Sequence, residues 1–189
     1  FEAGHVFIPG EQLGSESIPP LGARPSDEVL ADLNAGIPQQ PTFIAGLFAG
    51  TEHEAMPGAA PRAYDWRDAL DAVRLVAAAV SAEIQVRNGV HTAFHPGRVA
   101  EVLNAAGERV GFAGELHPKL LQELNLPERT CAFELDFSAL FADRVEAHQA
   151  TPVLTFPAAT QDVALLVDRD LPASEVERVL REGAGDLLE

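Results

Sequence analysis

The segment from His95 to Pro118 constrains the fold most, because it has the pattern of a β-hairpin that leads directly into a helix. Val99–Leu103 is a short apolar strand, and Ala106-Gly107 supplies a turn in which glycine is free to adopt positive φ. Val110–Leu116 returns as a glycine-rich strand, whose bare backbone lets another element approach closely. Pro118 stands where the first residue of a helix belongs. An apolar stripe on that helix is formed by Leu120, Leu121 and Leu124.

Other strands and helices are predicted on both sides of this hairpin. Strands are expected over Phe1–Ile8, Thr42–Ala49, Val90–Phe94 and Thr130–Phe137, and short helices over Ser26–Leu33 and Ser138–Phe141. Asp65 is a good N-cap for the clearest helix, which is predicted from Trp66 to about Val86, with Asn88-Gly89 as its end. Apolar residues recur along it with a helical period and include Ile84 in its last turn.

The pattern changes near the C-terminal end of the chain. Arg144–Pro152 is polar and aperiodic, which predicts two folded units joined near Val145–Pro152. Asp162–Val167 then predicts a buried strand, and Leu171-Pro172 opens a helix. The apolar residues expected on the inner face of that helix are Val176, Val179 and Leu180. Because a ferredoxin-like unit needs two such βα halves, the chain contains only the first half of one. The fold class is therefore α+β.

The charge of the chain argues against direct binding of nucleic acid. Its 189 residues carry 29 acidic and 13 basic side chains, a formal net charge of −16, and contain no basic run. Cys131 is the single cysteine, so no internal disulfide can form, and its apolar neighbours predict a buried, inert thiol in a reducing compartment. No apolar run is long enough to span a bilayer. Both ends of the chain look cut from a longer polypeptide.

Four side chains suggest one form of chemistry, a metal site. His91, His95, Glu115 and His117 could ligate zinc in a small metal-dependent hydrolase. Two histidines four residues apart on an extended segment lie too far apart to chelate together, so no bound zinc is expected. The simpler interpretation is that His95 and His117, each before a proline, form hydrogen bonds with turn backbone. No Walker loop or dinucleotide fingerprint is present, and no catalytic residue is assigned.

Several strings resemble the β subunit of bacterial phenylalanyl-tRNA synthetases. The specific ones are His95–Arg98 and Gly111–Pro118, which are similar to the family's HPGR and GELHP motifs. Supporting strings are Phe1–Phe7, Ile37–Pro41, Ala45–Gly50, Asp65–Ala69, Leu126–Phe137 and Phe156–Ala164. The match departs from the family pattern at His5 and Gln161, where arginine is usual, and at Asp65–Ala69, which lacks a lysine.

The resemblance implies two modules. Residues 1–147 would be the later part of an inactive, catalytic-like module with the antiparallel sheet of class II synthetases and flanking helices. Residues 153–189 would begin a truncated ferredoxin-fold anticodon-binding domain. Strands Phe1–Ile8 and Val110–Leu116 contain no arginine, so a triphosphate would face Glu2 and Glu115 with no cation to offset the repulsion. The fragment itself is therefore expected to hold no cofactor, whereas ATP and magnesium serve the parent enzyme.

The same resemblance implies the partners. A cytoplasmic heterotetramer of two α and two β subunits would attach phenylalanine to its tRNA, with catalysis in the α subunit. Pro157, Ala158, Ala159 and Thr160 would border the anticodon site in the intact subunit. Residues 158–189 carry eight acids and three bases, so this chain alone is expected to bind tRNA negligibly. The alternatives are the metal-dependent hydrolase and a generic protein-interaction module.

Overall fold

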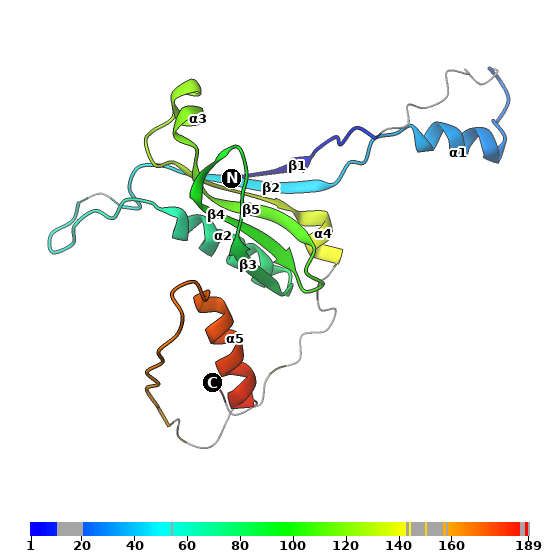
Figure 1. The fold of residues 1–189 in the computed structure, drawn as a ribbon. Helices are drawn as coiled ribbons and strands as arrows, with labels where there is room; N and C mark the ends of the chain where they lie inside the picture. The colour runs from blue at the N-terminus through cyan, green and yellow to red at the C-terminus, as the bar shows by residue number, and fades with distance from the viewer. Residues whose placement is uncertain are drawn as a thin grey trace. The chain divides into compact units, whose positions relative to one another are not determined.

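The chain forms two compact units, Phe1–His148 and Gln149–Glu189. The structure is a computed structural model, and it describes residues 1–10, 21–53, 55–142, 144, 150, 157, 159–185 and 188. Among these residues, the first unit carries a β-sheet with helices, and the second carries one helix (Figure 1).

An antiparallel sheet organises the first unit. Within the described residues it has six strands in the order β1-β2-β6-β5-β4-β3 (Figure 1). The strands are β1 (Glu2–His5), β2 (Thr42–Phe48), β3 (Ile84–Asn88), β4 (Phe94–Asn104), β5 (Arg109–Leu116) and β6 (Cys131–Asp136). The helices are α1 (Asp27–Ala35), α2 (Trp66–Ala79), α3 (Pro118–Glu123) and α4 (Phe137–Ala142). The predicted α+β class, an antiparallel sheet with flanking helices, is confirmed.

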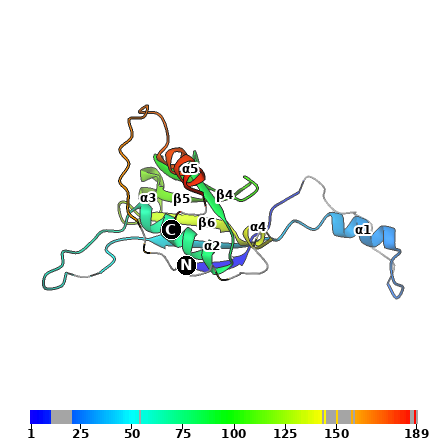
Figure 2. The same cartoon turned by 90° about the horizontal axis from the view of Figure 1, so that it is seen from below.

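The core of this unit lies between α2 and one face of the sheet, where the helix contacts β2, β5 and β6 (Figures 1 and 2). The buried helix residues Ala69, Leu70, Val73 and Ala77 pack in one cluster with Cys131, Phe133 and Leu135 of β6. Side chains alternate between the two faces of a strand, so the residues between these three on β6 point away from α2. The helix therefore covers one face, and on the other face Leu116 and Ala132 pack in a second, smaller cluster with Leu121 of α3.

The hairpin and helix predicted around Gly107 are confirmed, although β4 begins earlier than the expected strand, at Phe94. Gly107 has φ = +81° at the turn, as expected of the residue that needs the left-handed region. His117 caps α3 by accepting a hydrogen bond from the Lys119 amide, at 3.2 Å. The predicted stripe is wrong at Leu124, which is 58% exposed.

Two glycines of β5 allow the backbones of the neighbouring strands to approach closely, as the sequence predicted. A Cβ atom on Gly111 would collide with the carbonyl oxygen of Glu134, and one on Gly114 would collide with that of Arg98. Both neighbours are backbone atoms of paired strands and cannot move away independently. These positions therefore require glycine for lack of space.

The predicted helix from Trp66 to Val86 is too long. Helix α2 ends at Ala79, Ser81 adopts φ = +55°, and the Ala82 amide donates to the Ala77 carbonyl. This left-handed residue turns the chain back, so Ile84 belongs to β3 rather than to the helix. The strand predicted over Val90–Phe94 is wrong as well, because residues 90–93 connect β3 to β4 and only Phe94 belongs to a strand.

Replacing Asp65 by alanine is expected to lower the free energy of unfolding by about 1 kcal/mol. Its carboxylate accepts from the Arg67 amide at 2.8 Å, and the Asp68 carboxylate accepts from the Asp65 amide at 2.7 Å, forming a capping box. Urea unfolding followed by the fluorescence of Trp66, the single tryptophan, measures the change. Asp71→Ala, a largely exposed site on the same helix, is the control and should change stability little. Equal effects of the two substitutions would contradict the assignment of the cap.

The second unit departs further from expectation. Its helix, α5 (Ala173–Ala184), begins after Pro172 as predicted. The buried strand predicted over Asp162–Val167 is wrong, because these residues are exposed and form no strand. The physical reason is that the described part of this unit offers no second strand to pair with. Of the three residues expected to point inward from α5, Val176 is half-buried, whereas Val179 and Leu180 are exposed. The predicted linker near Val145–Pro152 lies outside the described residues except for Ala150.

Candidate functional site

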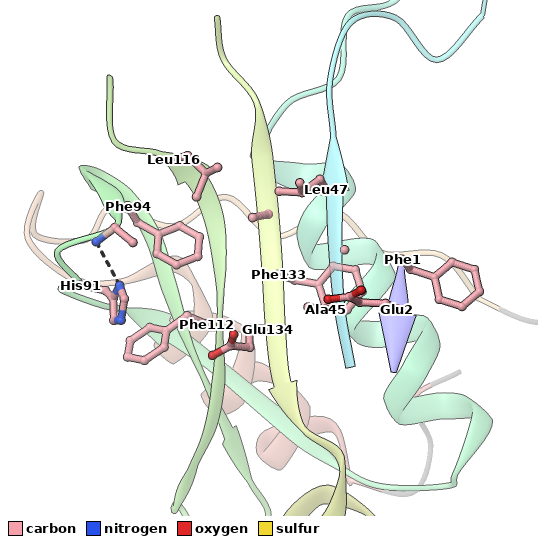
Figure 3. A pocket seen from close by; sticks show the side chains of 13 residues that line it. Phe1, Glu2, Ala45, Leu47, His91, Phe94, Phe112, Leu116, Phe133 and Glu134 are labelled. Atoms are coloured by element: carbon pink, nitrogen blue, oxygen red, sulfur yellow. Dashed lines mark hydrogen bonds between the residues drawn. The ribbon is translucent and has the colours of Figure 1, made fainter. Parts of the chain in front are cut away.

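A pocket of about 550 Å³ opens on the sheet of the first unit (Figure 3). It is lined by Phe1, Glu2, Ala45, Gly46, Leu47, His91, Ala93, Phe94, Phe112, Leu116, Ala132, Phe133 and Glu134. Ala132 and Glu134 of β6 alternate with Cys131 and Leu135, whose side chains belong to the α2 core. The pocket therefore occupies the face of the sheet opposite α2.

One row of cross-strand neighbours forms the floor of this pocket. Glu2 pairs with Ala45, Ala45 with Glu134, and Glu134 with Phe112, across β1, β2, β6 and β5. Directly paired residues share one face of a sheet, so these four side chains stand side by side. The small side chain of Ala45 therefore lies between the two glutamates in this row.

Aromatic rings close one side of the pocket. The His91 ring lies 5.4 Å from that of Phe94 and 4.6 Å from that of Phe112, centroid to centroid (Figure 3). The His91 Nδ1 atom accepts a hydrogen bond from the Ala93 amide, at 3.2 Å, which fixes the ring in place. The Arg109 guanidinium lies 5.0 Å from the centre of the Phe112 ring, a cation–π distance.

The pocket is acidic. None of its thirteen lining residues is lysine or arginine, whereas Glu2 and Glu134 both contribute carboxylates. The sequence pointed to Glu2 and Glu115 as the acids that a triphosphate would face, and it was wrong about Glu115. Glu115 shares its strand face with Ala113, which packs in the α2 core, and it does not line the pocket. The second acid that lines this pocket is Glu134.

Glu115 forms ion pairs with two arginines, which the sequence analysis did not predict. Its carboxylate is 6% exposed and accepts from Arg98 at 2.9 Å through both oxygens, with Arg129 at 3.5 Å. Arg98 comes from β4 and Arg129 from the loop before β6, so three segments are joined. This buried acid is therefore part of the structure rather than a free general base.

The residues of the hypothetical zinc site, His91, His95, Glu115 and His117, do not form one cluster. Glu115 is bound by arginines, His117 caps α3 and His91 belongs to the aromatic wall. The described residues contain no group of three or more histidine, cysteine or acidic side chains placed to hold a metal ion. The interpretation of His117 as a turn residue is confirmed. The same interpretation of His95 is wrong, since its buried Nδ1 has no hydrogen-bond partner there.

The residues expected to border an anticodon site lie in the second unit. Pro157, Ala159 and Thr160 are exposed, and Ala158 lies outside the described residues. Their role in binding tRNA stays a prediction. In the part of the chain that the structure describes, no helix is long and apolar enough to cross a membrane.

A helix-backed antiparallel sheet, with an open acidic pocket on its other face, is consistent with a synthetase-like module. Comparison with known proteins agrees. The chain belongs to the phenylalanyl tRNA synthetase beta chain CLM domain family, whose model matches residues 1–137.

Relatives named phenylalanine–tRNA ligase beta subunit match the whole chain. The protein from Leifsonia xyli is 47% identical over 191 residues, that from Streptomyces avermitilis 43% over 192, and that from Bifidobacterium longum 38% over 194. Each alignment covers 100% of this chain but 22–23% of the relative. The chain therefore spans about a quarter of the length of these curated relatives.

Proposed function

We propose that this chain is a non-catalytic part of the β subunit of a phenylalanine–tRNA ligase, and that it supports the catalytic site of an α subunit. Family membership supports the subunit, and the acidic pocket carries the non-catalytic role. A site that activates an amino acid must bind ATP, whose phosphates are held by arginine, lysine or magnesium. Glu2 and Glu134 would repel those phosphates, and none of the lining side chains is lysine or arginine.

The partners follow from the same proposal. The α subunit would bind ATP and magnesium and perform aminoacylation in a cytoplasmic assembly of two α and two β subunits. Residues 1–147 would form the catalytic-like module and residues 153–189 the first part of an anticodon-binding domain. In the intact subunit, Pro157–Thr160 would then border the site for the tRNA that carries phenylalanine. The excess of acids over bases in residues 158–189 supports weak tRNA binding by this chain alone.

The purified chain alone is expected to catalyse no phenylalanine-dependent exchange of pyrophosphate into ATP, because nothing in its pocket holds a triphosphate. When it is mixed with the α subunit of a related synthetase, we expect the two to elute together from a size-exclusion column. The α subunit with its own full-length β subunit is the positive control for both measurements. Exchange activity of the chain alone would refute the non-catalytic role, and separate elution from the α subunit would refute the supporting role.

A further inference from the structure

The pocket on the sheet contains two carboxylates that form no ion pair with the described residues. Glu2 and Glu134 take part in none of the ion pairs among the described residues, although most other acids on this unit's sheet and central helix have arginine partners, such as Glu101 with Arg87. Both carboxylates are exposed, and both have the same negative charge on one side of the sheet. A ligand that brings positive charge between them is attracted by both.

We infer that this pocket binds a small organic cation in which an ammonium group is linked to an aromatic ring. The proposal rests on three features that meet in one cavity: paired acids, a small residue between them and an aromatic wall. It goes beyond the support of an α subunit and does not depend on it.

Glu2 and Glu134 determine where the positive charge of the ligand would lie. Glu2 and Glu134 stand two strands apart in one row, and adjacent strands are about 4.8 Å apart, so their Cα atoms are separated by roughly 10 Å. Ala45 between them leaves room above the sheet for an ammonium group, whose three N–H donors can reach both carboxylates. Anionic ligands such as nucleotides are repelled by the same pair.

The aromatic side chains that line the pocket indicate which uncharged group the ligand carries. His91, Phe94 and Phe112 border the cavity next to Glu134, and Leu116 adds apolar surface. Its volume of about 550 Å³ falls in the usual range of small-molecule pockets, roughly 300–1,000 Å³. The Arg109 guanidinium already lies 5.0 Å from the centre of the Phe112 ring, so the apolar contacts of a ligand would come chiefly from His91, Phe94 and Leu116. An arylalkylammonium ion matches both the wall and the acids.

The acids also discriminate among related ligands. A neutral alcohol of the same shape gains the apolar contacts but no ion pair. Phenylalanine brings an ammonium group together with a carboxylate, and no lysine or arginine lines the pocket to receive that carboxylate. The expected order of affinity is therefore the amine first, with the alcohol and the amino acid both weaker.

Calorimetric titration of the full chain with 2-phenylethylammonium tests this inference. We expect saturable binding with a dissociation constant on the order of 1 mM or below, and binding of 2-phenylethanol or phenylalanine at least roughly fivefold weaker. Glu134→Gln should weaken amine binding roughly fivefold or more, because it removes the charge and keeps the shape. Glu83→Gln, which removes an exposed acid outside the pocket, is the matched control and should leave the affinity unchanged.

A second variant tests the place of binding independently of charge. Ala45→Leu fills the space between the two acids and should abolish amine binding while the circular dichroism spectrum stays unchanged. Equal affinities for the amine and the alcohol, no saturable amine binding, or unchanged binding by Glu134→Gln or Ala45→Leu would each overturn the inference. None of these results involves the α subunit, so they leave the proposed function to its own test.

Discussion

Leu135→Ala is expected to lower the free energy of unfolding of the first unit by about 2–5 kcal/mol. The Leu135 side chain is 0% exposed and packs in the cluster between α2 and the sheet. It lies on β6, which pairs with β2 on one side and β5 on the other, so the surrounding backbone is held by two strands and cannot collapse into the space. The lost contacts and the cavity left behind both destabilise the fold.

Urea unfolding followed by the fluorescence of Trp66 on α2 measures this loss in the unit that contains it. Leu124→Ala is the matched control, because it removes the same atoms from a side chain that is 58% exposed. Its effect should stay within about 0.5 kcal/mol. A midpoint for Leu135→Ala that matches that of the control would show that β6 is not packed against α2 as described.

Local signals in the sequence predicted those parts of the fold whose causes are local. Gly107 marks the turn because a positive φ is needed there, and Pro118 marks the start of α3 because it lacks an amide hydrogen. Asp65 marks the start of α2 because its carboxylate caps the first turn. In each case, the residue type and the structural requirement lie within a few positions of each other.

The C-terminal end of α2 could not be predicted in this way. Ile84 falls at the right spacing to extend the apolar face of the helix, and no glycine or proline separates it from Ala79. The helix ends because Ser81 adopts a left-handed conformation, which serine rarely takes, and because Ile84 pairs with Asn104 of β4. The pairing of Ile84 with β4 therefore determined where the helix ends, although the spacing of apolar residues in the sequence favours a longer helix.

The pocket could be predicted only in part. Glu2 was identified, but its neighbour across the sheet is Glu134 rather than Glu115, because the strand order places β6 between β2 and β5. That order depends on non-local pairing, which the alternation of residues within one strand cannot reveal. The alternation of side chains along β5 was informative, however. Phe112 and Leu116 line the pocket, so Glu115, an odd number of positions away from each, must point to the other face of the sheet.

The state of Cys131 bears on whether any covalent chemistry is open to this chain. Burial, and secondarily the negative charge of Glu115, raises the pKa of its thiol to about 11. The charged groups that act on it are Glu115, Asp65, Arg129 and Asp68, and none is a histidine that could serve as a base. Its sulfur donates instead to the Arg129 carbonyl, at 3.4 Å. The residue therefore behaves as a core side chain, as the sequence predicted.

At pH 8, the thiol of the folded chain is expected to react with Ellman's reagent at least roughly a hundredfold more slowly than that of the unfolded chain. The raised pKa removes most of the thiolate, and burial keeps the reagent from the 0% exposed side chain. The absorbance of the released thiolate gives the rate, with glutathione in the same buffer as the control. One equivalent should react in urea, since the chain has one cysteine.

The same pKa fixes the direction of a pH effect on stability. The folded state holds the Cys131 proton to a pKa of about 11, whereas the unfolded chain releases it near the ordinary thiol pKa of 9.0. The contribution of this group to stability is thus complete below pH 9 and is lost as the pH rises toward 11. Cys131→Ser should remove this part of the pH dependence. Rapid labelling of the folded chain at pH 8 would contradict both expectations, because it would require a thiolate that the core around α2 and β6 does not permit.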